Sequence, residues 1–204
     1  MVHFARLSGL SRRDAGHRAR ELFDRFGRNN AAVFDDQGWP YFIREIFDSF
    51  YPGYGASWPT AQGALGKTFE QGSARGLVFE RYDGTHLTYA QGVEQNFRAA
   101  LRTALTAAEH RESLLRTFVA FRRDAGGDEA ERSYVLLPGD DPARALRLAR
   151  TLAWNGIQVL EAGASFQRGG RTFPAGSFVV PVRQPAGYLV RNLLDPEVPM
   201  DEDF

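Results

Sequence analysis

The sequence of 204 residues predicts an α/β fold made of two units. Short apolar segments of strand type alternate with amphipathic segments of helix type in both halves, which is typical of α/β proteins. A charged segment with a Gly-Gly pair, residues 123–132, has no apolar period and is predicted to be a linker. We therefore expect one unit over residues 1–122 and a smaller unit over residues 133–204.

The first unit begins with a predicted helix over residues 12–26. Apolar residues recur there at helical spacing, Ser11 is a candidate N-cap, and Gly27 is expected to end the helix. A second helical stretch is predicted over residues 30–36, with its end at Gly38.

Two strand signals and a long helix complete the first unit. The small and apolar residues of 63–69 predict a buried strand that a neighbouring backbone can approach closely. Residues 76–82 predict a strand, and Asp83-Gly84 predicts the two-residue turn of a hairpin with residues 85–89. Apolar residues at helical spacing then predict one helix over 90–122.

The second unit begins with a strand, a helix and another strand. The strands are predicted over 134–138 and 157–161, and the helix between them has Asp141 as its N-cap and Pro142 at its first position. This order predicts a right-handed βαβ unit with parallel strands. The remaining predicted elements are a hairpin centred on 169–170, a strand over 177–182 and a helix over 185–194.

Composition argues against several functions. Lys+Arg and Asp+Glu both number 25, so the net charge is zero, which argues against a nucleic-acid role driven by phosphate neutralisation. No apolar run approaches the length of a membrane span, and the first residues have no signal-peptide core. The chain has no cysteine, which excludes disulfides, thiolate metal ligands and a cysteine nucleophile.

The histidines form no zinc motif. A catalytic zinc usually takes three protein ligands, two of them close in sequence. None of His3, His17, His86 and His110 is followed by a glutamate three residues later. His17 and Glu21 are spaced to share a helix face, but an exposed charge pair explains them better. We therefore expect no metal site built by this chain alone.

The strongest candidate site is an aromatic loop that leads to a carboxylate. Residues 51–58 combine three aromatic residues with Gly and Pro, and Glu70 follows the predicted strand over 63–69. A carboxylate at the end of a buried strand beside such a loop can perform proton transfer. The alternative interpretation is a structural loop with a salt-bridged Glu70.

The segment FYPGYGASWPTAQGALGKTFEQGSARG, residues 50–76, resembles the C-terminal part of the catalytic domain of zinc carboxypeptidases of the carboxypeptidase A-like class. The family's loop Trp, its Gln-Gly pair and its strand-ending Phe-Glu pair are matched here by Trp58, Gln62-Gly63 and Phe69-Glu70. The segment 175–181, AGSFVVP, is similar to a later region of large bacterial members. The resemblance covers most of the chain from about residue 27.

The resemblance implies the C-terminal part of a carboxypeptidase-like α/β sheet domain, followed by an incomplete amidotransferase-like unit. It implies hydrolysis of the terminal bond of a peptide substrate, with Glu70 as the general acid/base. Tyr54 would be the substrate-binding loop tyrosine, with Tyr51 as the alternative. Ala56 would lie near the specificity pocket, where a small neutral residue would fit no charged side chain.

The resemblance also implies zinc as the cofactor, but the family's zinc ligands and substrate-gripping arginines have no match before Glu70. We therefore expect this chain to begin after the metal-binding half and to be inactive alone. A non-catalytic peptide- or protein-binding α/β module, able to associate with itself through exposed apolar surface, is the alternative function. The family suggests an exported or periplasmic location.

Overall fold

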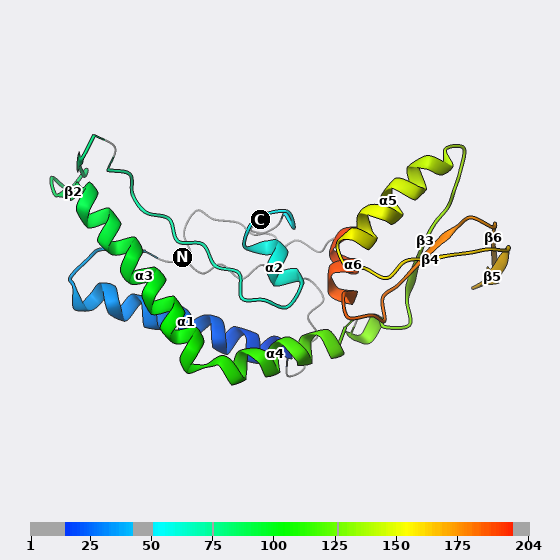
Figure 1. Ribbon diagram of the computed structural model, residues 1–204, viewed down its shortest axis with the longest axis horizontal. Helices are drawn as coiled ribbons and strands as arrows, with labels where there is room; N and C mark the ends of the chain where they lie inside the picture. The colour runs from blue at the N-terminus through cyan, green and yellow to red at the C-terminus, as the bar shows by residue number, and fades with distance from the viewer. Residues whose placement is uncertain (1–14, 43–50, 75, 126, 198–204) are drawn as a thin grey trace.

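The computed structural model describes residues 15–42, 51–74, 76–125 and 127–197, which form a mixed α/β fold of helices and small antiparallel sheets. The helices are α1 (Ala15–Asp36), α2 (Ser57–Ala61), α3 (Tyr89–Glu109), α4 (Arg111–Arg123), α5 (Pro142–Trp154) and α6 (Gly187–Leu194). The strands are β1 (Val78–Glu80), β2 (His86–Thr88), β3 (Ser133–Leu136), β4 (Leu160–Glu161), β5 (Phe166–Arg168), β6 (Arg171–Phe173) and β7 (Phe178–Pro181). In Figure 1, α1, α3 and α4 lie at one end, α5 and the sheet of β3 lie at the other, and α2 lies beside α6 between them.

The first helix continues through the glycine that was expected to end it. α1 runs through Gly27 to Asp36, so the predicted stop at Gly27 is wrong. The buried apolar residues of α1 are Leu22, Phe23 and Phe26. Contacts with α3 and α4 hold this segment helical in spite of the low helix propensity of glycine. Gly38, with φ 63°, follows the helix end as predicted, and Ser11 lies outside the described residues.

Residues 63–69 form no strand, so that prediction is wrong. The backbone N–H of Gly66 donates to Thr60 Oγ1 at 3.1 Å, which directs a hydrogen bond to α2 and not to a sheet. A Cβ on Gly66 would lie 1.9 Å from the carbonyl oxygen of Ala56. The small residues of 63–69 therefore allow this segment to lie close against the short helix α2.

The predicted hairpin is present, but the predicted two-residue turn is wrong, because Glu80 pairs with His86 and residues 81–85 connect the strands. β1 and β2 pair antiparallel, and Asp83 Oδ1 accepts from the Thr85 N–H at 2.9 Å in the turn between them. Gly84 has φ 80°, a conformation that glycine adopts without strain. Thr88 then caps α3 through a capping box with Gln91.

The long helix predicted over 90–122 is two helices that meet at His110. His110 ends α3 and precedes α4, with φ −111° and ψ 18°. The bend allows both helices to contact α1. Within the described part of the chain, no helix is both long and apolar enough to cross a lipid bilayer.

The helices and strands predicted over residues 133–204 are present, but their order in the sheet differs from the prediction. Asp141 Oδ1 accepts from the Arg144 N–H at 3.2 Å and Pro142 opens α5, as predicted. β3 and β4 run in the same direction, but β7 lies between them and pairs antiparallel with both. β7 is the most apolar of these three strands, and its residue Val180 is fully buried, as expected for a strand at the centre of a sheet. β5 and β6 form the predicted hairpin.

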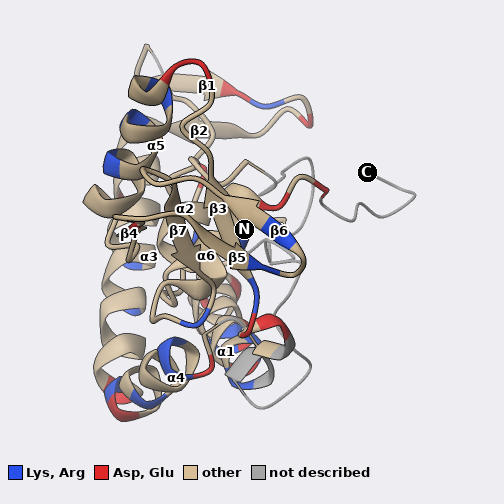
Figure 2. Ribbon diagram, turned by 90° about the vertical axis from the view of Figure 1, so that its right-hand side faces the viewer, with Lys and Arg blue, Asp and Glu red and all other residues tan. Residues whose placement is uncertain are grey.

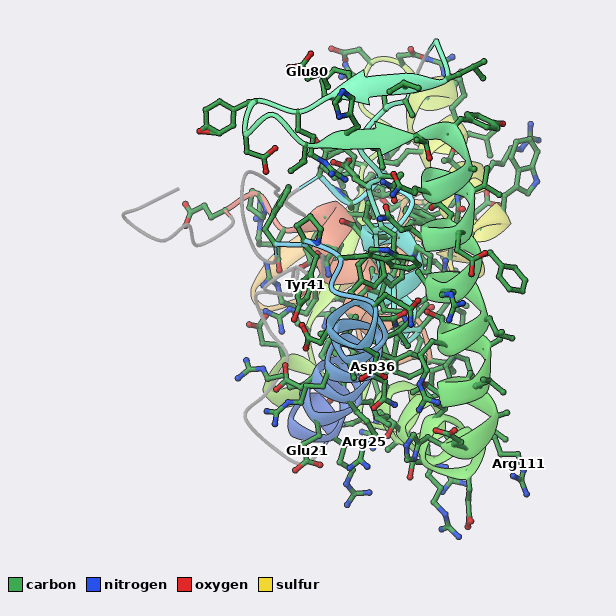
Figure 3. The ribbon with its side chains drawn as sticks, turned by 90° about the vertical axis from the view of Figure 1, so that its left-hand side faces the viewer. Glu21, Arg25, Asp36, Tyr41, Glu80 and Arg111 are labelled. Carbon is green, nitrogen blue, oxygen red and sulfur yellow. The ribbon has the colours of Figure 1, made fainter. Side chains whose placement is uncertain are left out.

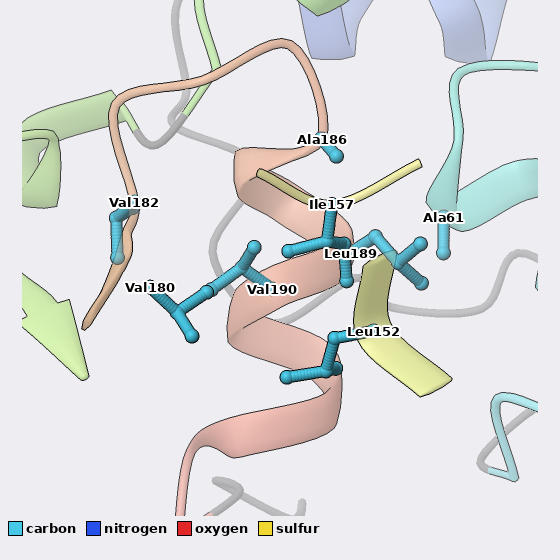
Figure 4. Packing of buried hydrophobic residues seen from close by; sticks show 8 residues of the cluster. All are labelled: Ala61, Leu152, Ile157, Val180, Val182, Ala186, Leu189 and Val190. Atoms are coloured by element: carbon cyan, nitrogen blue, oxygen red, sulfur yellow. The ribbon is translucent and has the colours of Figure 1, made fainter. Parts of the chain in front are cut away.

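The main apolar cluster contains residues from both sides of the predicted linker. Its buried members are Ala61, Leu152, Ile157, Val180, Val182, Ala186, Leu189 and Val190, and Figure 4 shows Leu189 and Val190 of α6 among them. Ala61 belongs to α2, and Trp58 of the same helix packs on the cluster. A second link is the ring of Phe121 on α4, whose centroid lies 4.6 Å from that of Tyr188 on α6. The short helix that follows the aromatic loop is therefore attached to the main apolar cluster.

Candidate functional site

The aromatic loop has a fixed local geometry. The N–H of Tyr54 donates to the carbonyl of Tyr51 at 3.2 Å, and the N–H of Trp58 donates to that of Tyr54 at 3.0 Å. The two tyrosine rings meet edge to face with centroids 5.4 Å apart. A Cβ on Gly53 would lie 2.5 Å from the ring of Tyr51, so any larger residue there would require this ring to move. Both rings are nevertheless exposed, by 59% for Tyr51 and 43% for Tyr54.

The short helix α2 anchors this loop. Ala56 precedes the helix, and its carbonyl accepts from Thr60 Oγ1 at 2.7 Å. After the helix, Gly63 has φ 98° and lies against Phe121, where a Cβ would be 2.7 Å from the ring. Because α2 also packs on the main cluster through Trp58, the exposed tyrosines stand on a rigid base.

Glu70 does not have the predicted setting. Its side chain is exposed, and no strand precedes it. Within the described residues, no hydrogen bond or ion pair reaches Glu70, so neither a buried carboxylate nor a salt-bridged one is found. The error follows from the wrong strand over 63–69. No such contact or ring contact among the described residues joins Glu70 to Tyr51 or Tyr54, so the sequence-predicted site residues are not brought together by direct contact.

Sequence analysis missed a buried amine close to this segment. Lys67 places its Nζ 3.8 Å from the ring centroid of Phe26 and 5.7 Å from that of Phe69. This Nζ is buried without a hydrogen-bond partner in the part of the chain that the structure describes. Burial lowers the pKa of Lys67 to about 8. The available signal was that the chain's only lysine stands in a run of small and apolar residues.

A group of charged residues joins the predicted linker to α6. Asp195 accepts from the hydroxyl of Tyr134, and its carboxylate lies 2.9 Å from Arg132 and 3.4 Å from Arg191. Glu129 pairs with the same arginines at 2.7 and 3.1 Å. Burial and then the hydrogen bond to Asp195 raise the pKa of Tyr134. The charges of the four ionised side chains balance, which is typical of a structural ion-pair network.

The residues present do not fit a zinc ion. Across the ranges that the structure describes, no three or more His, Asp or Glu side chains gather as a metal site. His86 lies on β2 and His110 at the α3–α4 junction, while His3 and the side chain of His17 are outside the described positions. We derive no chemistry from zinc for this chain.

Glu70 and the tyrosine loop are therefore close in sequence, but no hydrogen bond, ion pair or ring contact among the described residues joins them. The resemblance to zinc carboxypeptidases accordingly depends on the residues of 50–76 and 175–181. Comparisons with protein-family models, curated proteins and solved structures found no match to this chain.

Proposed function

We propose that this chain forms one part of a metallocarboxypeptidase-like site. Glu70 would act as the general acid/base, and Tyr54 would contact the peptide substrate. The metal ligands would come from a different polypeptide segment, because the described residues do not provide them. The chain alone would bind peptide weakly and would not hydrolyse it.

The observation that carries the proposal is the exposed, edge-to-face pair of tyrosines in the same segment as an exposed Glu70. Tyrosine offers a peptide both an apolar ring and a hydroxyl donor. No side chain among the described residues pairs with the Glu70 carboxylate, which could therefore accept a proton from an attacking water and return it to the leaving amine. Ala56, between Tyr54 and α2, would favour an uncharged terminal side chain.

Peptide binding and hydrolysis by the purified chain test this proposal. The probe is a fluorescein-labelled short peptide with a free C-terminal carboxylate and an apolar last residue, followed by fluorescence anisotropy. We expect weak binding that is reduced at least tenfold in Tyr54→Ala. The control is Tyr82→Ala, which changes a tyrosine that is fully exposed in the β1–β2 turn. Equal binding by both variants, or no binding by the unmodified chain, would contradict the role of Tyr54.

Hydrolysis and metal content test the dependence on another segment. We expect no hydrolysis of the same peptide with added zinc and less than one tightly bound zinc per chain. One zinc per chain, together with hydrolysis that Glu70→Gln abolishes, would show that the chain carries a complete site. Glu70→Gln is expected to change the free energy of unfolding by less than about 0.5 kcal/mol, because Glu70 is exposed and has no described partner.

A protein-binding module is the second candidate function, and a different observation favours it. The side chains of Val93, Phe97, Leu101 and Leu105 on α3 are large, apolar and exposed. Figure 3 shows α3 along one edge of the molecule, between the hairpin that carries Glu80 and the junction at Arg111. Contiguous apolar surface of this kind marks protein interaction sites.

A further inference from the structure

The amine of Lys67 lies close to two aromatic rings. Its Nζ is 3.8 Å from the ring centroid of Phe26 and 5.7 Å from that of Phe69. Phe26 belongs to α1 and is only 4% exposed, so its ring gives the amine an apolar surface in the interior of the fold. The face of a ring attracts an ammonium group, but it does not replace the hydrogen bonds that water gives to this group.

No described group pairs with this amine. The Nζ atom is buried without a hydrogen-bond partner, and no ion pair reaches it within the described residues. Because burial penalises the charged form, the pKa of Lys67 is lowered to about 8. At pH 7.4 about 20% of this amine is then neutral, compared with about 0.1% of an ordinary lysine. A neutral lysine amine in an apolar setting is a nucleophile.

The buried amine belongs to a side chain that also reaches the surface. Lys67 as a whole is only half-buried, and Phe69 and Glu70, which follow it at two and three positions, are exposed. The four-carbon stem of lysine is flexible, so rotation about its bonds can bring Nζ to solvent while the backbone stays folded. A small reagent can therefore meet the neutral amine.

The surroundings of Nζ decide which adduct suits this amine. Reaction with carbon dioxide would leave a buried carbamate anion, and acylation would leave an amide whose N–H and C=O groups both require hydrogen bonds. Reaction with an aldehyde gives an imine, which is uncharged and has no N–H group. Of these three products, the imine is the one that matches an Nζ without a polar partner among the described residues. The rings of Phe26 and Phe69 favour an aldehyde that is itself apolar.

We propose that Lys67 is a covalent binding site for small, uncharged aldehydes. The lone pair of the neutral Nζ attacks the carbonyl carbon, and the carbonyl oxygen leaves as water with both protons of the amine, so the products are an imine and one water molecule. The step is balanced without an oxidant or a reductant. Aromatic rings beside the imine limit the access of the water that would reverse the reaction. The inference goes beyond the function proposed above and uses neither Glu70 nor Tyr54, so either proposal can fail alone.

Reductive trapping of the imine tests this site. The probe is benzaldehyde with sodium cyanoborohydride, which reduces an imine to a stable secondary amine. Lys67 is the only lysine, so mass spectrometry of proteolytic peptides needs to separate its adduct only from that of the N-terminal amine. At pH 7.4 we expect Lys67 to be labelled at least tenfold faster in the folded chain than in the same chain unfolded in guanidinium chloride. Equal or slower labelling of the folded chain would overturn the proposal.

A matched variant moves the single lysine to an exposed position. The double substitution Lys67→Arg with Arg111→Lys keeps the net charge and places the amine at the start of α4, where Arg111 is exposed and points away from the molecule in Figure 3. Figure 2 shows positive and negative residues interspersed on α4, so the moved amine does not lie in a field of one sign. We expect its labelling to be at least tenfold slower than that of Lys67. Equal rates would show that Lys67 has the reactivity of any lysine and would contradict the proposal.

The pH dependence and a charged aldehyde test the apolar character of the site. The pH of half-maximal labelling should be at least one pH unit lower for Lys67 than for the lysine of the double variant, because burial favours the neutral amine of Lys67. 4-Carboxybenzaldehyde should label Lys67 at least fivefold more slowly than benzaldehyde, because its carboxylate would have to enter apolar surroundings. The same half-maximal pH in both proteins, or the same rate with both aldehydes, would refute an apolar imine site at Lys67.

Discussion

Replacing Lys67 with methionine is expected to stabilise the fold at pH 7. The Nζ of Lys67 is buried, and the described residues give it no hydrogen bond. Its favourable contact is with the face of Phe26, 3.8 Å away. Methionine has a similar length and can place its sulfur against the same ring without burying a charge.

The magnitude follows from the pKa of this amine. Burial lowers the pKa of Lys67 from 10.5 to about 8, a difference that corresponds to about 3 kcal/mol at 1.36 kcal/mol per pH unit. The side chain is only half-buried, and solvent screening reduces this value. The contact of the ammonium group with the face of Phe26 stabilises the charged form by about 1 kcal/mol. We therefore expect Lys67→Met to raise the free energy of unfolding by about 1–2 kcal/mol.

The effect should depend on pH with a defined sign. The folded protein releases the Lys67 proton near pH 8 and the unfolded protein near pH 10.5. Between these values the unfolded state binds more protons, so the stability of the unmodified chain rises with pH relative to the variant. Below pH 8 both states are protonated and the destabilisation by Lys67 is complete. Above about pH 10.5 it is lost.

Urea unfolding of both proteins at pH 7 and pH 10 measures this difference. Lys67→Arg is the control, because arginine keeps its charge at both pH values and should not stabilise. Labelling with ¹³C-lysine gives a single lysine NMR signal, whose titration reports the pKa directly. A variant less stable than the unmodified chain at pH 7, or a stability difference that is the same at both pH values, would refute the reasoning.

Two further substitutions test the anchor of the aromatic loop and the charged network. Gly66→Ala should destabilise by more than about 2 kcal/mol in urea unfolding, because its Cβ would lie 1.9 Å from the Ala56 carbonyl oxygen. Gly55→Ala, with no atom within 4 Å of the new Cβ, should be nearly neutral, and equal effects would contradict this packing. Asp195→Asn should destabilise by about 2 kcal/mol, because it leaves Arg132 and Arg191 to share Glu129. Asp140→Asn, at an exposed position, is the control. If Asp195→Asn leaves the free energy of unfolding unchanged, the network adds no stability.

The elements that sequence predicted correctly are those determined by residues a few positions apart. The β1–β2 hairpin and the Asp141 cap both depend on contacts within a few residues, and both are present, although the hairpin connection is longer than the predicted two-residue turn. The position of β7 between β3 and β4 depends on which strand is most buried in three dimensions. Local pattern contains little of that information.

The errors around the candidate site have the same origin. Residues 63–69 have the composition of a buried strand, but close backbone approach can equally be to a helix, and here Gly66 contacts α2. The prediction that Glu70 stands at the end of a buried strand depended on that assignment and is wrong for the same reason. Gly27 has the signature of a helix end, but packing of α1 on α3 and α4 overrides the propensity of one glycine.

Helix α3 shows what periodicity can and cannot determine. The stripe from Val93 to Leu105 correctly predicted a helix, since spacing depends only on the helix repeat. Spacing does not reveal which face meets the rest of the chain. The face of α3 that packs against α1 can consist of small and polar residues because Asn29 and Asn30 of α1 donate hydrogen bonds to Thr106 and Thr103 on that face. The large apolar residues opposite that face are exposed within the described part of the chain, which spacing alone could not reveal.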